Sequence, residues 1–129
     1  MAHVLILQTG HDPAVCAIAV LLCQGDGHST TLAALGSGLL DWLHDDPPDI
    51  VLVDVPRSGL ELGRWLRALP ALANVPLVAL AKGARPEELS LLAADAFSLV
   101  LASPFRPSRL LEAIEELTPS RRASLPIPS

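Results

Sequence analysis

Short aliphatic runs alternate five times with segments of helical periodicity, and this alternation constrains the fold more than any other feature of the chain. The runs predicted to be strands are 4–7, 28–35, 49–54, 76–81 and 98–102. The predicted helices are 14–22, 39–43, 60–69, 87–94 and 109–117. Strands that alternate with helices form a parallel sheet through right-handed crossovers, with helices on both faces. We therefore predict an α/β fold built on a doubly wound, five-stranded parallel sheet.

Size and composition are consistent with one such domain. The chain has 129 residues, of which 50% are hydrophobic and 3% aromatic, so the core must be mainly aliphatic. We expect the domain to span residues 1–117 and residues 118–129, rich in Pro and Ser, to form a flexible tail. That tail would also suit a linker to a further domain.

Charge and hydropathy exclude several classes of partner. The formal net charge of -5 argues against a nucleic-acid surface, because binding a polyanion depends on clustered Lys and Arg. No apolar run is long enough to span a bilayer, and the first residues do not resemble a secretory signal. We therefore expect a cytoplasmic protein without nucleic-acid or membrane partners.

The two cysteines and the four histidines indicate no catalytic or metal site. Cys16 and Cys23 lie seven residues apart in one helical pattern, about 10 Å along its axis, which is too far for a disulfide. We interpret both as small core residues of a reduced protein. The histidines have no metal-ligand spacing, so we expect no metal site and no enzymatic activity.

Ligands and reactive groups of a doubly wound sheet lie beyond the carboxyl ends of its strands. Here those ends carry Gln8-Thr9, Asp54, Ala81-Lys82 and Ser103-Pro104. Asp54 closes the clearest strand in the chain, an otherwise aliphatic run, and is the strongest candidate for a functional side chain.

The residues around three strand ends resemble those of response-regulator receiver domains, which are CheY-like. Asp49 to Asp54 followed by Gly59-Leu60 resembles the strand that carries the phosphorylated aspartate and the helix after it. Val75 to Ala81 resembles the fourth strand, and Ala102-Ser103-Pro104-Phe105 the end of the fifth. The resemblance covers residues 4–117 and implies the flavodoxin-like strand order 2-1-3-4-5, with Asp54 at the phosphoacceptor position.

The same resemblance implies a degenerate site. The acidic pair that helps to hold Mg²⁺ aligns with the neutral Gln8 and Thr9, and the signalling hydroxyl aligns with Ala81. The family's invariant lysine is replaced by Ser103, and only Asp54 and Pro104 are retained. We expect no cofactor, and we do not expect even weak Mg²⁺ binding.

Two acidic residues keep alternative interpretations. Asp54 is either a structural acceptor that ties loops to the central strand, which we favour, or a residual phosphoacceptor. Asp12 is either an acidic substitute in a weak metal site or, as its position before Pro13 favours, the N-cap of the first helix.

The resulting hypothesis is a pseudo-receiver of bacterial signalling that acts through protein-protein interaction without normal aspartyl phosphorylation. The alternatives are a phosphorylatable receiver that uses Asp54, or an unrelated flavodoxin-like cofactor binder. The partner would be another protein, an attached effector domain or a second copy. In receivers the face made by the fourth helix, fifth strand and fifth helix commonly mediates docking. Here that face would carry Leu89, Leu91, Leu92, Arg106 and Arg109.

Overall fold

The computed structural model describes residues 2–10, 12–34, 38, 39, 43, 47–55, 59–82, 85, 87 and 97–118. The strands are β1 (His3–Gln8), β2 (Ser29–Ala34), β3 (Ile50–Val55), β4 (Leu77–Lys82) and β5 (Leu99–Ser103). The helices are α1 (Pro13–Gly25), α3 (Gly59–Ala68) and α5 (Pro107–Leu117), with the 3-10 turn η1 (Pro70–Leu72) after α3. Of the predicted second and fourth helices too few residues are described to define an element.

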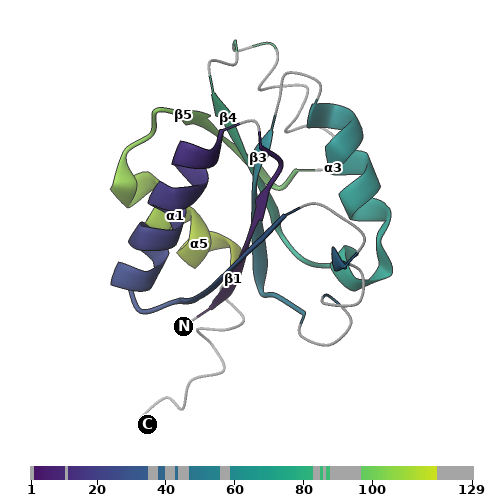
Figure 1. The fold of residues 1–129 in the computed structure, drawn as a ribbon, viewed down its shortest axis with the longest axis horizontal. Helices are drawn as coiled ribbons and strands as arrows, with labels where there is room; N and C mark the ends of the chain where they lie inside the picture. The colour runs from purple at the N-terminus through teal and green to yellow at the C-terminus, as the bar shows by residue number, and fades with distance from the viewer. Residues whose placement is uncertain are drawn as a thin grey trace, which may run out of the picture.

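All five strands pair in parallel in the order β2-β1-β3-β4-β5, as predicted (Figure 1). Every residue of β3 is buried, and so are the four central residues of β1. Strands that are covered on both faces carry continuous aliphatic runs, which explains why the sequence identified these two most clearly.

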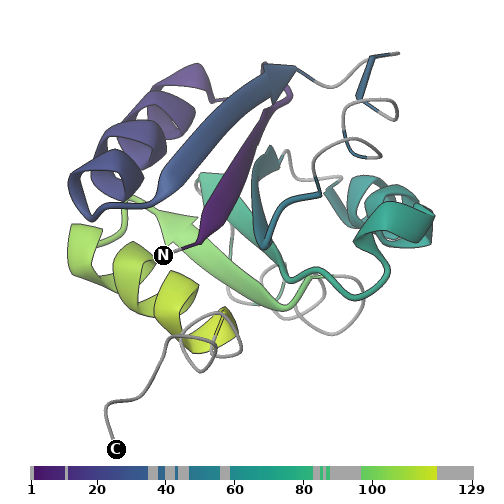
Figure 2. The same ribbon diagram turned by 90° about the horizontal axis from the view of Figure 1, so that it is seen from below.

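Helices cover both faces of the sheet. Helices α1 and α5 lie together on one face and α3 lies on the other, which Figure 2 shows from below. Alternate strand residues divide between two aliphatic cores: Ile50 and Leu52 face α1 and α5, whereas Val51 and Val53 face α3. By the same alternation Asp54, which follows Val53, is directed toward the α1 layer.

Local signals set the helix boundaries. Helix α1 begins with Pro13 in its first turn, directly after an Asp12 whose side chain accepts a hydrogen bond from Val15 N at 3.3 Å. Helix α5 ends at Leu117 and is capped by Thr118, whose backbone N–H and hydroxyl both donate to Ile114 O. Thr118, the first residue of the expected tail, is buried at 8% exposure, while 119–129 lie outside the described residues.

Arg67 fastens the segment between α3 and β4. Its guanidinium Nη1 donates hydrogen bonds to the carbonyls of Leu72, Ala73 and Val75 at 2.9, 3.4 and 2.7 Å. One side chain therefore adds a charged donor to three carbonyls of a turn that also makes backbone hydrogen bonds of its own. Neighbouring Trp65 is 46% exposed.

Within the described part of the chain, no helix combines the length and hydropathy that crossing a bilayer requires.

Candidate functional site

Asp54 lies at the carboxyl end of the central strand and is completely buried, with 0% of its surface exposed. Its neighbours Val53 and Val55 pack into the α3-side core, which directs the carboxylate toward the loop that joins β1 to α1. A buried carboxylate is costly unless hydrogen bonds compensate the lost hydration. The loop must therefore supply donors.

Two backbone amides of the β1–α1 loop provide these donors. Thr9 N donates to Asp54 Oδ1 at 2.7 Å, and Asp12 N donates to Asp54 Oδ2 at 2.8 Å. Thr9 Oγ1 also donates to the main-chain carbonyl of Asp54 at 3.0 Å. Each carboxylate oxygen thus accepts a short, charge-assisted bond, and the acid ties the loop to β3.

Gly10 makes this loop geometry accessible. Its φ of +90° lies in the left-handed region that side chains disfavour, and it falls between the two residues whose amides reach Asp54. Both bonds described here come from the loop after β1, while residues 56–58 and the Ser103 side chain lie outside the described residues.

Asp12 serves the fold with both its backbone and its side chain. The N–H binds Asp54, while the carboxylate caps α1 through Val15 N. The N-cap interpretation is therefore confirmed.

Cys16 is the member of the site that sequence reasoning missed, because it was interpreted only as a core residue. It is 1% exposed on the first turns of α1, beside Asp54. Burial raises the pKa of its thiol from 9.0 to about 12, with further contributions from the negative charge of Asp54, a hydrogen bond to that carboxylate and the charge of Asp12. Cys16 lies four residues after the Asp12 cap, which places it on the same side of the helix and was the available signal. The thiol stays protonated at neutral pH and can act as a third donor to Asp54, not as a nucleophile.

Cys23 is fully buried two turns further along α1. Burial, followed by the charge of Asp26, raises the pKa of its thiol to about 11. Both cysteines are free, as predicted.

The remaining predicted site positions lie at or near the carboxyl ends of β1, β4 and β5. Gln8 ends β1 and is partly buried, and Ala81 packs into the α3-side core, on the other face of the sheet. Ser103 ends β5 and is followed by an exposed Pro104. Lys82 is exposed, strand alternation places it on the Asp54 side of the sheet, and its backbone is in register with Ser103.

The predicted docking face is described only in part. Leu89, Leu91 and Leu92 lie outside the described residues. Arg106 is exposed just before α5, and Arg109 forms an ion pair with Glu116 of the same helix at 3.7 Å. This exposed pair contributes little to stability.

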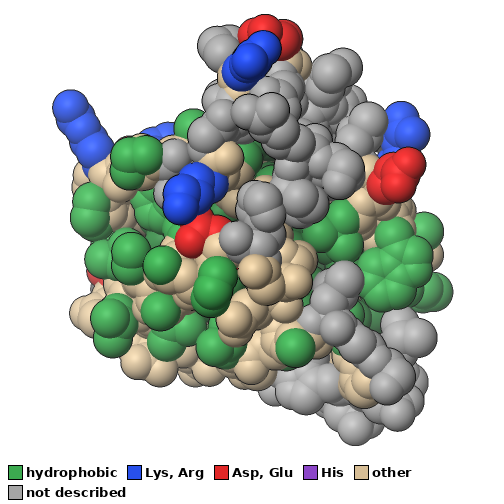
Figure 3. Space-filling model, turned by 45° about the horizontal axis from the view of Figure 1, so that its top comes forward, with side chains coloured by type: hydrophobic (Ala, Val, Ile, Leu, Met, Phe, Trp, Pro, Cys, Tyr) green, Lys and Arg blue, Asp and Glu red, His purple; other side chains and the backbone are tan. Residues whose placement is uncertain are grey.

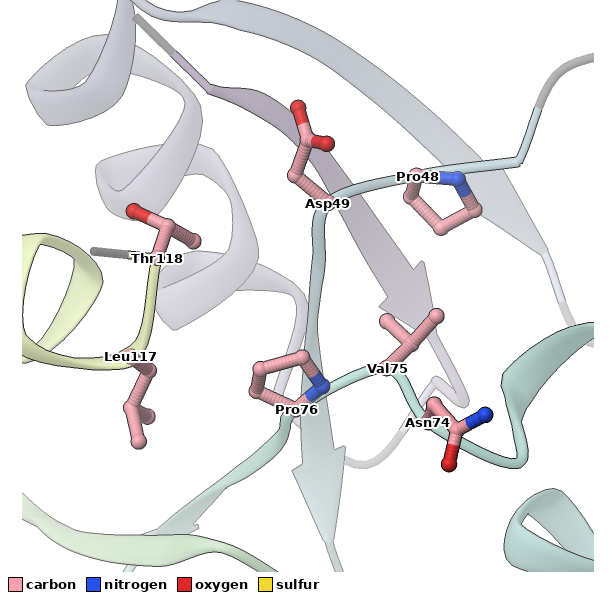
Figure 4. A pocket seen from close by; sticks show the side chains of 7 residues that line it. All are labelled: Pro48, Asp49, Asn74, Val75, Pro76, Leu117 and Thr118. Atoms are coloured by element: carbon pink, nitrogen blue, oxygen red, sulfur yellow. The ribbon is translucent and has the colours of Figure 1, made fainter. Parts of the chain in front are cut away.

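A pocket of about 270 Å³ lies at the opposite end of the strands from Asp54 (Figure 4). Its lining comes from the amino-terminal ends of β3 and β4 and the end of α5: Pro48, Asp49, Asn74, Val75, Pro76, Leu117 and Thr118. It therefore belongs to a different region from Asp54, which is at the carboxyl end of β3.

Among the described residues, no group of three or more His, Cys, Asp or Glu side chains is arranged to hold a metal ion. Near Asp54 the carboxylate oxygens accept hydrogen bonds from two backbone amides, and the Asp12 carboxylate accepts one from the first turn of α1. Mg²⁺ prefers several hard oxygen ligands in near-octahedral geometry. The oxygen ligands present around Asp54 do not match that preference.

Comparisons with known proteins agree with this fold. No family model matches the chain. The polar-differentiation response regulator DivK of Brucella ovis is 25% identical over 97 residues, which cover 73% of this chain and 79% of DivK. A putative response regulator of Chloroflexus aurantiacus superimposes with a TM-score of 0.75 at 22% identity, over 92% of this chain and 99% of that one. A sensor histidine kinase receiver domain of Pseudomonas aeruginosa, which holds a magnesium ion in its active-site cleft, gives 0.73 at 21% identity, covering 92% and 98%.

The structural likenesses establish the CheY-like, flavodoxin-like fold. Together with the sequence similarity to DivK, they support a response-regulator receiver domain of two-component signalling.

Proposed function

We propose that this receiver domain is a pseudo-receiver, a cytoplasmic protein-interaction module without enzymatic activity in which Asp54 is a structural anchor. The observation that carries the proposal is the pair of bonds from Thr9 N and Asp12 N, which occupy both carboxylate oxygens of a fully buried side chain. A phosphoacceptor must present one oxygen to a phosphodonor. Here the side chain is fully buried and its two oxygens hold the loop through charge-assisted hydrogen bonds, so a phosphodonor would reach it only if the loop opened.

The neighbouring side chains support the same proposal. Gln8 and Thr9 contribute no negative charge, Ala81 offers no hydroxyl, and the Asp12 carboxylate caps a helix. Transfer of a phosphoryl group to Asp54 with the help of a metal ion would therefore lack the acidic ligands that hold the ion, and the ion is what neutralises the charge of the phosphoryl group.

Output would then depend on binding, with a protein partner or an attached effector domain as the recipient. Residues 1–117 would form this module and 118–129 the connecting tail. The face that includes Arg106 and Arg109 remains our proposed docking surface for such a partner.

Mass spectrometry of the intact protein tests the anchor role. The chain is incubated with acetyl phosphate and Mg²⁺ beside a receiver domain that retains its full acidic set, and both are weighed. We expect a phosphoryl adduct on the control and none on this chain. An adduct that is absent from Asp54→Asn would refute the proposal.

One observation favours the second candidate, a phosphorylatable receiver. Lys82 is exposed on the Asp54 side of β4 and is in register with Ser103, the position at which the resemblance places the family lysine. Lys82 on β4 would then bind the phosphoryl oxygen that the family lysine binds from β5. In that case the phosphoryl adduct forms in the mass assay. Its yield falls in Lys82→Ala and is retained in the control Lys82→Arg, which keeps the positive charge.

A further inference from the structure

Helix α1 and strand β2 form a part of the surface that lacks formal charge. Neither Pro13–Gly25 nor Ser29–Ala34 contains an acidic or basic residue. A helix on the surface of a globular domain normally carries polar residues on its outer face. Here Leu21 is 70% exposed, and Ile18 on α1 and Leu32 on β2 are each 50% exposed. Figure 3 shows hydrophobic side chains gathered on the side of the molecule where α1 lies.

Strand β2 is also an edge. In the described part of the chain it pairs with β1 alone, so its outer row of backbone donors and acceptors has no strand beside it. Natural sheets protect such edges with charged side chains, proline or bulges. The six residues of β2 contain no charge and no proline.

The edge and the helix form one continuous surface, which we call the α1–β2 face: Ala17, Leu21, Gln24, Thr30 and Leu32. Thr30 and Leu32 are in register with Val4 and Ile6, which belong to the α1-side core, so they lie on the α1 side of the sheet. Gln24 Nε2 donates to Thr30 Oγ1 at 3.0 Å, which identifies the flank of α1 that faces the edge. Ala17 lies seven residues before Gln24 and therefore on the same flank.

We propose that the α1–β2 face binds a second copy of this chain about a twofold axis perpendicular to the sheet. That axis makes the two β2 strands antiparallel and keeps each side chain on its own side, so the ten strands form one sheet and the two α1 helices lie side by side. Pairing Leu32 with its mate brings these two half-exposed side chains together near the axis. The interface is isologous, as in most homodimers.

Spacing supports this arrangement. Helix α1 packs on β2 and β1 and also reaches β3, so its axis lies roughly half to one strand spacing, about 2.4–4.8 Å, inside the edge. Adding one spacing of about 4.8 Å between the paired strands separates the two helix axes by about 10–14 Å. Packed helices are about 8–10 Å apart, and a small residue such as Ala17 on the facing flank permits the close approach. A single twofold rotation therefore pairs the two β2 strands and also brings the two α1 helices into contact.

Charge favours a second copy as the occupant. Two chains that each carry a net charge of -5 repel one another over most orientations. A twofold contact places a surface against its own copy, so a patch that carries charge of one sign would repel itself. Helix α1 and strand β2 carry no formal charge, so their contact adds no such repulsion, and the apolar side chains of both chains are buried.

The size of the face predicts the affinity range. Both elements are about 20 Å long, and the helix and sheet layers together are about 20 Å deep, which gives roughly 400 Å² per chain in projection. That value, about 800 Å² for the two chains together, is smaller than a standard specific interface, so we expect a weak, reversible dimer with a dissociation constant in the high micromolar range.

Sedimentation equilibrium of the full chain, from about 1 µM to about 300 µM, measures this association. Leu32→Glu places two carboxylates at the axis and should weaken the dimer at least tenfold. Because Leu32 is half exposed, the variant should retain its circular dichroism spectrum. Ala17→Glu provides a second, independent disruption on the helix if the strand variant fails to fold. Trp65→Glu, a similarly exposed residue on α3, is the matched control and should leave the dimer unchanged.

A mixture of Leu32→Glu and Leu32→Lys should restore association, because the axis then brings opposite charges together. A monomer at every concentration would overturn the proposal, and so would a dimer indifferent to Leu32→Glu and Ala17→Glu. Failure of the two folded position-32 variants to associate on mixing would equally refute the twofold pairing. None of these outcomes depends on whether Asp54 accepts a phosphoryl group.

Discussion

Replacement of Asp54 should destabilise the fold in two graded steps. Asp54→Ala leaves the buried Asp12 N–H and the partly buried Thr9 N–H without their acceptor. Each unpaired donor costs about 1–3 kcal/mol, so we expect a loss of about 2–6 kcal/mol. Asp54→Asn keeps one acceptor oxygen and sets its NH₂ group against the other amide, so about half of that loss should remain. The total stability of a domain is only about 5–15 kcal/mol, and both effects should be easy to resolve.

Urea unfolding followed by circular dichroism measures both losses. Glu112→Ala removes one negative charge from the exposed face of α5 and serves as the control, with a midpoint close to that of the native chain. The order of midpoints should be native, then Asp54→Asn, then Asp54→Ala. An unchanged midpoint for Asp54→Ala would show that the loop amides do not depend on this carboxylate, and the anchor role would be wrong.

Two further predictions concern stability away from Asp54. Arg67→Ala should lower the free energy of unfolding by about 1–3 kcal/mol, because three carbonyls between α3 and β4 lose a charged donor, and Arg67→Lys should lose less. Equal melting temperatures for the native chain, Arg67→Ala and Arg67→Lys in calorimetry would contradict this. Stability should also fall as pH rises above 9, since the unfolded thiols of Cys16 and Cys23 lose protons there while the folded ones, with pKa values raised to about 12 and 11, retain them. The decline should flatten in the double alanine variant, and an equal slope in both proteins would exclude the thiols as its cause.

The strands were predictable because their sequences contain the information that determines them. Residues 4–7 and 50–53 are aliphatic without interruption, and only a strand covered on both faces buries such a run. Helix α1 was equally accessible, because Asp12 and Pro13 mark its start with residues whose local chemistry favours that position.

The hydrogen bonds of the site were not predictable in the same way. Asp54 was identified from its place at a strand end, but its donors are backbone amides, and any residue type other than proline carries one. Which amides reach it depends on the turn at Gly10, a three-dimensional property of the loop. Cys16 was missed because its apolar character also explains its burial, and nothing in the sequence distinguishes a core thiol from one that contacts a carboxylate.

The amides of Thr9 and Asp12 report most directly on whether Asp54 is an anchor or a phosphoacceptor. Nuclear magnetic resonance of ¹⁵N-labelled protein follows both signals during titration with Mg²⁺ and then with beryllofluoride, an analogue of the phosphoryl group. The anchor role predicts that both amides exchange slowly with solvent, as strongly hydrogen-bonded groups do, and that neither signal moves. Saturable shifts of these two signals that disappear in Asp54→Asn would contradict it and establish Asp54 as a working phosphoacceptor.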